Sequence, residues 1–283
     1  MKLPFVLAKR FVAGENFSQA IPKVEEINKS DIKVTLDLLG ENVRDRETAD
    51  ETVKNYINLL KGINEKGLNA SISIKLTMLG LDIDYKYCRD NLFSLLDVAR
   101  KFDQFVRIDM EGSDYTQKTM DIFREAHEEY GKHVGIVIQA YLHRSKQDID
   151  ELAEMGADVR LVKGAYKEPE RLAIQGMPAI REAFKEYTKV LLEKTPYPRI
   201  ATHDDELIEW TKKYAADNGI GKARFEYQML YGLRQQTCEE LSDQGYNVRI
   251  YIPYGTMWFP YFSRRLKERK ENIWFVLSTL FKS

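Results

Sequence analysis

Short apolar runs and longer amphipathic segments alternate along this chain from residue 33 onward. Each short run holds four to six residues and is rich in β-branched side chains, as expected of strands buried on both faces. The predicted strands cover residues 33–38, 70–75, 105–110, 134–139, 159–162, 199–202, 223–228 and 248–252. Between them the apolar positions repeat with the period of an α-helix. The predicted helices cover residues 48–61, 91–102, 116–130, 146–155, 180–192, 206–218 and 233–244.

Alternation of strand and helix predicts parallel strands joined by crossover helices, and therefore an α/β fold. Eight such units in 283 residues match a single (β/α)8 barrel of the TIM type, which typically needs ~250 residues. An open doubly wound sheet is less favoured because no glycine-rich turn follows the first strand.

The first thirty residues do not follow this alternation. A short helical segment is expected within Pro4–Val12, and a second at Gln19–Asn28 with Ser18 as its N-cap. We therefore expect residues 1–30 to pack on the barrel and residues 31–283 to form it. The irregular stretch Lys167–Pro178 could close over a ligand as a lid.

Charge and cysteine content narrow the functional classes. The formal net charge of -1 gives no general attraction to nucleic acid or to anionic lipid. The two cysteines, Cys88 and Cys238, form no C-x-x-C pair, which favours a reducing, cytoplasmic compartment. The apolar run near Met1 is too short for a signal peptide, and no segment approaches the ~20 apolar residues of a membrane helix.

Polar side chains occur at the expected C-terminal end of nearly every strand, where barrel enzymes place their active sites. These positions are Asp37, Lys75, Asp109, Gln139, Arg160, Lys163, Thr202, His203, Glu226, Gln228 and Tyr251. Lys75 and Arg160 fall within or next to apolar runs, and a buried charge is costly unless it is paired. The four histidines show no metal-ligand spacing, so no metal is expected. Lys75 or Lys163 as the Schiff-base lysine of a class I aldolase stays open as an alternative.

A second concentration of charge follows the last strand. Glu268 lies four and three residues after Arg264 and Arg265, within reach of both on a helix. The pattern fits an exposed helix with a surface ion pair of little energetic value. It fits equally an arginine pair that binds a carboxylate at the barrel mouth.

Several motifs together resemble the proline dehydrogenase family, in particular its short single-function bacterial form. The resemblance extends from Asp37 nearly to the C-terminus, with the motifs in the same order and at strand ends. These motifs are Ser73–Thr77, Arg160–Tyr166, Ala201–His203, and the stretch from Tyr251 to Arg264-Arg265-Leu266. The same barrel forms part of the bifunctional proline-utilisation proteins. The resemblance implies a distorted (β/α)8 barrel whose final helix lies over the barrel mouth.

The resemblance also implies an activity. Members of the family bind FAD non-covalently and oxidise L-proline to Δ1-pyrroline-5-carboxylate, the first step of proline catabolism. Electrons would pass to a quinone-type acceptor, with peripheral contact at the inner face of the membrane as a further expectation. A separate pyrroline-5-carboxylate dehydrogenase would be needed downstream, because this chain lacks the length for a second enzyme domain. A catalytically inactive barrel that only binds ligand is the remaining rival.

By the same resemblance, individual residues acquire expected roles. The expected catalytic residues are Asp109, which would also hold Lys75, and Arg160. The expected substrate-binding residues are Lys75, Tyr251, Arg264, Arg265 and Glu268. The expected cofactor-binding residues are Met110, Gln139, Arg160, Val162, Lys163, Gly164, Ala165, Tyr166, Thr202, His203 and, with less support, Glu226. The bulk of Tyr251 would leave little room for a 4-hydroxyl on the proline ring.

Overall fold

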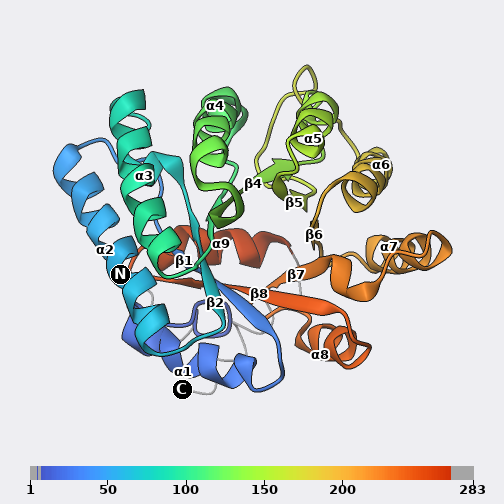
Figure 1. The fold of residues 1–283 in the computed structure, drawn as a ribbon, viewed down its shortest axis with the longest axis horizontal. Coiled ribbons are helices and arrows are strands. Elements are labelled where there is room, and N and C mark those ends of the chain that lie inside the picture. Colours follow the sequence, from blue (N-terminus) through green and yellow to red (C-terminus); the bar gives the residue numbers. More distant parts are fainter. Residues whose placement is uncertain (1–4, 6–7, 269–283) are drawn as a thin grey trace.

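Eight parallel strands close into a barrel in the computed structural model, which describes residue 5 and residues 8–268, with side chains through residue 263 (Figure 1). The strands are β1 (Lys33–Leu38), β2 (Ala70–Ile74), β3 (Val106–Ile108), β4 (Val134–Gln139), β5 (Asp158–Val162), β6 (Arg199–Ala201), β7 (Glu226–Leu230) and β8 (Asn247–Tyr254). Each strand pairs with its neighbour in sequence, and β8 pairs with β1 in register from Lys33 opposite Arg249 to Leu38 opposite Tyr254. The expected (β/α)8 fold is therefore confirmed.

Most of the helices in the described residues surround the barrel and cover its outer face, and α9 lies at one end of it (Figure 1). They are α1 (Phe17–Asn28), α2 (Arg46–Glu65), α3 (Tyr85–Lys101), α4 (Ser113–Tyr130), α5 (Ser145–Glu154), α6 (Met177–Lys194), α7 (Asp205–Asp217), α8 (Gln235–Asp243) and α9 (Trp258–Glu268). Val53, Leu60 and Ile63 show the pattern in α2, where one apolar face is buried against the strands. All six residues of β4 are buried, as a strand covered on both faces requires.

The N-terminal segment departs from one expectation. Helix α1 begins at Phe17, and the side chain of Asn16 caps it by accepting a hydrogen bond from the Gln19 amide at 3.1 Å. Ser18 lies inside the first turn and donates to Asn16 Oδ1 at 2.7 Å, so the expected Ser18 cap is wrong. Both residue types cap helices well, and sequence alone did not place the first turn. Of the expected segment 4–12, residues 8–11 form a turn, and residues 1–4, 6 and 7 lie outside the described part.

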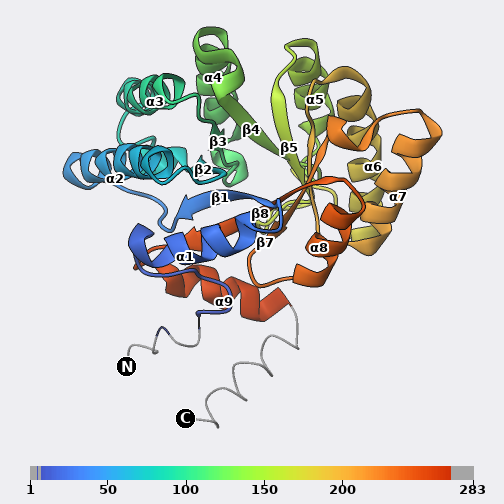
Figure 2. The same cartoon turned by 60° about the horizontal axis from the view of Figure 1, so that its bottom comes forward.

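Helix α9 lies beside the N-terminal segment at one end of the barrel (Figure 2). Trp258 and Phe262 of α9 pack with Phe11 and Val12 in a separate apolar cluster. Pro260 and Tyr261 line the cavity that opens at the C-terminal ends of the strands. Helix α9, the last helix in the described residues, therefore borders the barrel mouth, where the resemblance implied a helix. Within the part of the chain that the structure describes, no helix is long and apolar enough to cross a bilayer.

Candidate active site

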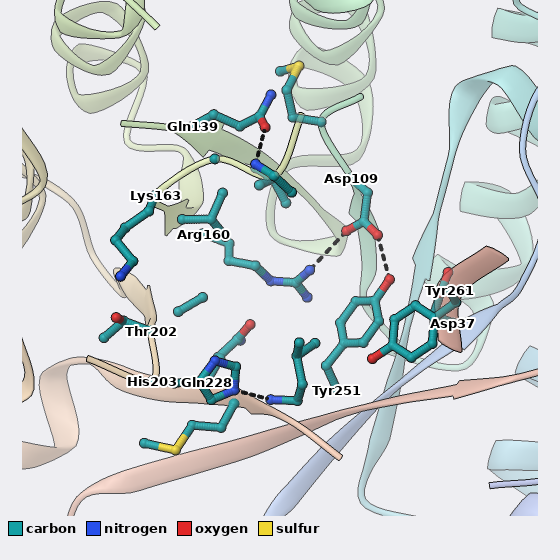
Figure 3. A pocket seen from close by; sticks show the side chains of 18 of the residues that line it. Asp37, Asp109, Gln139, Arg160, Lys163, Thr202, His203, Gln228, Tyr251 and Tyr261 are labelled. Atoms are coloured by element: carbon teal, nitrogen blue, oxygen red, sulfur yellow. Dashed lines mark hydrogen bonds and ion pairs between the residues drawn. The ribbon is translucent and has the colours of Figure 1, made fainter. Parts of the chain in front are cut away.

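A cavity of about 1700 Å³ opens at the C-terminal ends of the strands, and residues in or directly after all eight strands line it. Figure 3 shows the side chains that converge there. Parallel strands in a closed barrel end on the same side, which explains how residues far apart in sequence meet in one cavity. Among the described side chains, no three His, Cys, Asp or Glu are grouped as metal ligands would be.

Asp109 is the centre of the polar group on the cavity floor. Its Oδ1 accepts a hydrogen bond from an Arg160 guanidinium nitrogen at 2.9 Å, and its Oδ2 accepts one from the Tyr251 hydroxyl at 2.8 Å (Figure 3). The Lys75 ammonium lies 3.6 Å from Asp109 Oδ2 and 2.8 Å from Asp37 Oδ1. The expected pairing of Asp109 with Lys75 is therefore present, but Asp37 is the nearer partner. The Asp109 carboxylate thus accepts hydrogen bonds from Arg160 and Tyr251 and lies within ion-pair distance of Lys75.

Arg160 lies in the middle of β5, not at its end. Its second terminal nitrogen donates to the Ser73 hydroxyl at 3.1 Å, and its guanidinium carbon lies 5.4 Å from the centre of the Tyr251 ring. Its Nε is buried without a hydrogen-bond partner among the described residues. A buried donor without a partner is costly, so a ligand or an ordered water in the cavity is expected to satisfy it.

Burial and neighbouring charges act in opposite directions on the pKa values of the ionisable groups on the cavity floor. Burial alone would lower the pKa of Lys75, but the carboxylates of Asp37 and Asp109 outweigh it and raise that pKa well above its usual range. Burial raises the pKa of Asp37, partly opposed by the Lys75 ammonium. Burial and the neighbouring Asp109 also raise the pKa of Tyr251, which therefore stays a neutral hydrogen-bond donor. Lys75 consequently remains a charged ammonium throughout the neutral range.

A second part of the cavity lining comes from the C-terminal ends of β4, β5 and β6 and the loops that follow them. Gln139 Oε1 accepts from the Ala165 amide at 3.3 Å, and its Nε2 donates to the Glu111 carbonyl at 3.0 Å. His203 Nε2 accepts from the Leu230 amide at 2.9 Å, which leaves the proton of the neutral ring on Nδ1 (Figure 3). These contacts fix the loop after β5 and the orientation of the imidazole.

Gly164 has a backbone conformation that other residues rarely adopt. Its φ is +127°, and a Cβ at this position would lie 2.3 Å from the Tyr141 ring. Glycine is therefore required both for the turn and for its close approach to Tyr141. Next to it, the Lys163 ammonium donates to Asp204 Oδ2 at 3.0 Å, and Arg181 donates to the same carboxylate.

Most of the residues singled out in the sequence meet in this one cavity. Those that line it are Lys75, Asp109, Met110, Gln139, Arg160, Val162, Lys163, Gly164, Ala165, Tyr166, Thr202, His203 and Tyr251. Arg264, Arg265 and Glu268 belong to α9, but their side chains lie outside the described part of the structure.

Glu226 does not reach the cavity. The seventh strand was predicted at residues 223–228, whereas residues 222–224 form a 3-10 turn and β7 runs from Glu226 to Leu230. Glu226 is therefore the first residue of the strand, fully buried at the end of the barrel opposite the mouth. There it pairs with Arg199 and Arg249. Glu226 is therefore not placed to contact a cofactor in the cavity, and that expectation is wrong.

Asp37, Gln228 and Tyr261 line the cavity, although the sequence did not single them out as site residues. The sequence indicated Asp37 and Gln228 only as polar residues at strand ends, and it gave no role to Tyr261 of α9. The burial of a carboxylate at Asp37 gave a signal, because such a group needs a cation. No local pattern showed that this cation is Lys75, which directly follows β2, the strand that pairs with β1.

The irregular segment after β5 is tied to its neighbours. Ile174 donates its amide to the Tyr141 carbonyl at 2.7 Å, and His143 donates its amide to the Leu172 carbonyl at 3.0 Å. Glu168 accepts hydrogen bonds from the amide and hydroxyl of Ser113 at the start of α4. A lid movement of residues 167–178 would have to break these contacts, and it stays a prediction.

Known proteins resemble this chain over nearly its whole length. The family model for proline dehydrogenase matches residues 20–277. The chain belongs to the proline dehydrogenase family. Proline dehydrogenase 2 of Bacillus subtilis (strain 168) is 42% identical over 277 residues, which cover 98% of this chain and 91% of the relative. The proline dehydrogenase of Deinococcus radiodurans is 35% identical over 280 residues, with 98% and 90% covered.

A solved structure of the family shares the fold. Proline utilization A from Bdellovibrio bacteriovorus, in a crystal structure inactivated by N-propargylglycine, superimposes with a TM-score of 0.87 and 27% identity. The match covers 93% of this chain but only 32% of that longer protein. The chain is thus similar to one part of a larger member of the family.

Proposed function

We propose that this protein oxidises L-proline to Δ1-pyrroline-5-carboxylate, with FAD bound non-covalently in the barrel mouth. The observation that carries the proposal is the Lys75, Asp109, Arg160 and Tyr251 group, in a chain of the proline dehydrogenase family. Purified protein given L-proline and a soluble quinone should form the pyrroline product only when FAD is bound. Product formation by protein free of FAD would contradict the proposal.

The residues present fit a flavin dinucleotide. Pockets for small ligands commonly measure about 300–1,000 Å³. A cavity of about 1700 Å³ has room for a dinucleotide and a small substrate together. The lining combines apolar groups, such as Met110 and Val162, with buried polar atoms that lack partners among the described residues, namely Arg160 Nε and Gln228 Oε1. FAD, when bound, supplies the two-electron acceptor for the oxidation.

The protein's own groups then have to bind and orient proline. Lys75 and Arg160 carry two positive charges on the floor, and Asp37 and Asp109 balance them with two carboxylates. These four groups alone therefore give little net attraction for a substrate carboxylate. Additional cations are needed, and the sequence provides Arg264 and Arg265 on α9, the helix that borders the mouth.

Replacing Arg264 or Arg265 by alanine should therefore weaken proline binding. We expect KM to rise by at least about 30-fold in each variant, because a buried charged contact is worth ~2–5 kcal/mol. Steady-state kinetics at saturating acceptor measure this, with Lys267→Ala on the same helix as a control. An unchanged KM in both arginine variants would move the carboxylate site elsewhere.

Tyr251 should make the enzyme discriminate against ring substituents. Its hydroxyl is fixed by Asp109 at 2.8 Å, so the ring cannot move aside without losing a hydrogen bond. We expect kcat/KM for L-proline to exceed that for 4-hydroxyproline by about 10-fold or more. Equal values for the two substrates would show that Tyr251 does not border the substrate ring.

The geometry does not favour the aldolase alternative. A Schiff-base lysine must lose its proton to become a nucleophile. The paired carboxylates of Asp37 and Asp109 instead raise the pKa of Lys75 and keep it charged. Lys163, the other candidate, is ion-paired with Asp204.

The electrons taken from proline have to leave the reduced flavin before the next turnover. A quinone-type acceptor would reoxidise the flavin, with the protein in the cytoplasm and in peripheral contact with the inner face of the membrane. A separate pyrroline-5-carboxylate dehydrogenase would take the product onward. Competition between soluble and membrane-embedded quinones in a turnover assay tests the acceptor.

A further inference from the structure

Gln228 is a polar side chain of the cavity whose ligand partner the proposed function does not specify. It lies in the middle of β7, lines the cavity and is only 3% exposed. Its Oε1 is buried and has no hydrogen-bond partner within the described residues. A buried acceptor without a donor is unfavourable, so its position at a ligand cavity indicates that a ligand donor completes it.

The orientation of the Gln228 amide is fixed by Glu226, which lies on the side of Gln228 away from the barrel mouth. Its Nε2 donates to Glu226 Oε1 at 2.6 Å. Glu226 is held in turn by Arg249, whose Nε donates to the same oxygen at 2.8 Å, and by Arg199. A flipped amide would bring two acceptor oxygens face to face beside Glu226. Gln228 therefore presents an acceptor, and not a donor, away from Glu226.

The neighbours of Gln228 belong to the side of the cavity assigned to the cofactor. Gln228 pairs in register with Ala201 of β6, and its carbonyl accepts from the Thr202 amide at 3.2 Å. His203, which directly follows Thr202, lines the same cavity. The proposed substrate-binding residues Lys75 and Tyr251 are held instead by the carboxylates of Asp37 and Asp109, although Gln228 also lies opposite Arg249 of β8.

We propose that Gln228 binds the cofactor by accepting a hydrogen bond from an N–H or O–H group of FAD, with Glu226 as the positioning residue that orients its amide. This inference rests on the proposed function, because it assumes that the cavity holds FAD. The amine of proline is the other N–H donor that could reach the cavity. Cofactor affinity and substrate KM therefore have to be measured separately.

Gln228→Met tests the proposal, because methionine has a similar length and no strong acceptor. Gln104→Met is the matched control. Gln104 also has a buried Oε1 without a partner in the described structure and donates through Nε2 to the Leu60 carbonyl at 2.9 Å. It lies just before β3, at the end of the barrel opposite the mouth, and does not line the cavity. Gln228→Asn, which keeps the amide but withdraws it by one methylene, is the milder second variant.

FAD should be titrated into flavin-free protein of each variant, and the visible spectrum and midpoint potential of the bound flavin recorded. We expect the Kd for FAD to rise about five- to tenfold in Gln228→Met and less in Gln228→Asn, with a shifted flavin spectrum. Gln104→Met should match the wild type.

Two outcomes would overturn the inference while leaving the proposed function intact. One is unchanged affinity and spectrum in both Gln228 variants. The other is a raised proline KM with unchanged FAD affinity, which would assign the acceptor to the substrate. Failure of the wild-type protein to bind FAD would overturn the proposed function itself, and this inference with it.

Discussion

Asp109→Asn should reduce kcat/KM for proline by about 100-fold while leaving the fold intact. The substitution keeps the shape of the side chain but removes the charge that pairs with Arg160 and Lys75. It also places an amide N–H against one of the donors that Asp109 now accepts from, either Arg160 or the Tyr251 hydroxyl. A 100-fold loss corresponds to ~2.7 kcal/mol, a reasonable effect when several positioned groups shift together.

Asp97→Asn is the control for this variant. Asp97 also accepts from a tyrosine hydroxyl, that of Tyr130 at 3.1 Å, and from an arginine, Arg100, at 2.9 Å. It lies on α3, outside the barrel mouth, and does not line the cavity. Stopped-flow reduction of the enzyme by proline under anaerobic conditions measures the chemical step in both variants. Equal rates for Asp109→Asn and wild type would show that the Asp109 carboxylate is not needed for the oxidation of proline.

Glu226→Gln should be the most damaging single change to stability. The Glu226 carboxylate is fully buried and accepts hydrogen bonds from four side chains, those of Tyr197, Arg199, Gln228 and Arg249. Removing its charge leaves two buried guanidiniums with less compensation, which typically costs ~3–5 kcal/mol. We expect Tm to fall by about 10 °C. Glu239→Gln, at an exposed position on α8, should leave Tm unchanged.

The same carboxylate predicts how stability depends on pH. Burial alone would raise the pKa of Glu226, but the guanidiniums of Arg249 and Arg199 hold it well below its usual range. Its contribution is therefore fully present above the unfolded pKa of about 4.3 and is lost as pH falls toward the lower folded pKa. Chemical unfolding at pH 7 and pH 3.5 should show a smaller stability difference for Glu226→Gln than for wild type. Parallel losses in the two proteins would contradict this account.

The sequence predicted the barrel well because its strands carry a strong local signal. The run Val134–Gln139 is apolar up to its last residue, and the observed β4 has the same limits as the predicted strand. The seventh strand carried a weaker signal, since aromatic residues Phe225 and Tyr227 stand on both sides of Glu226. Pairing with β6 and β8 determines where β7 begins. This pairing is not visible in the local sequence pattern.

The site was predictable to the extent that its residues are costly to bury. Lys75 and Arg160 stood out because a charge in an apolar run needs a partner. The identity of the partners depended on the register of the strands, because pairing of β1 with β2 sets Asp37 opposite Ser73 and so places it near Lys75. Gln228 gave no such signal, because a neutral amide in a strand is common and its unpaired oxygen is visible only in the structure.

The visible spectrum of the purified protein, recorded before and after anaerobic addition of L-proline, tests the central claim most directly. The account predicts flavin absorption bands that bleach with L-proline, more slowly with 4-hydroxyproline at the same concentration, and not with NADH. Flavin bands that do not respond to proline would contradict the proposed substrate. A colourless protein that also fails to take up added FAD would contradict the proposed function as a whole.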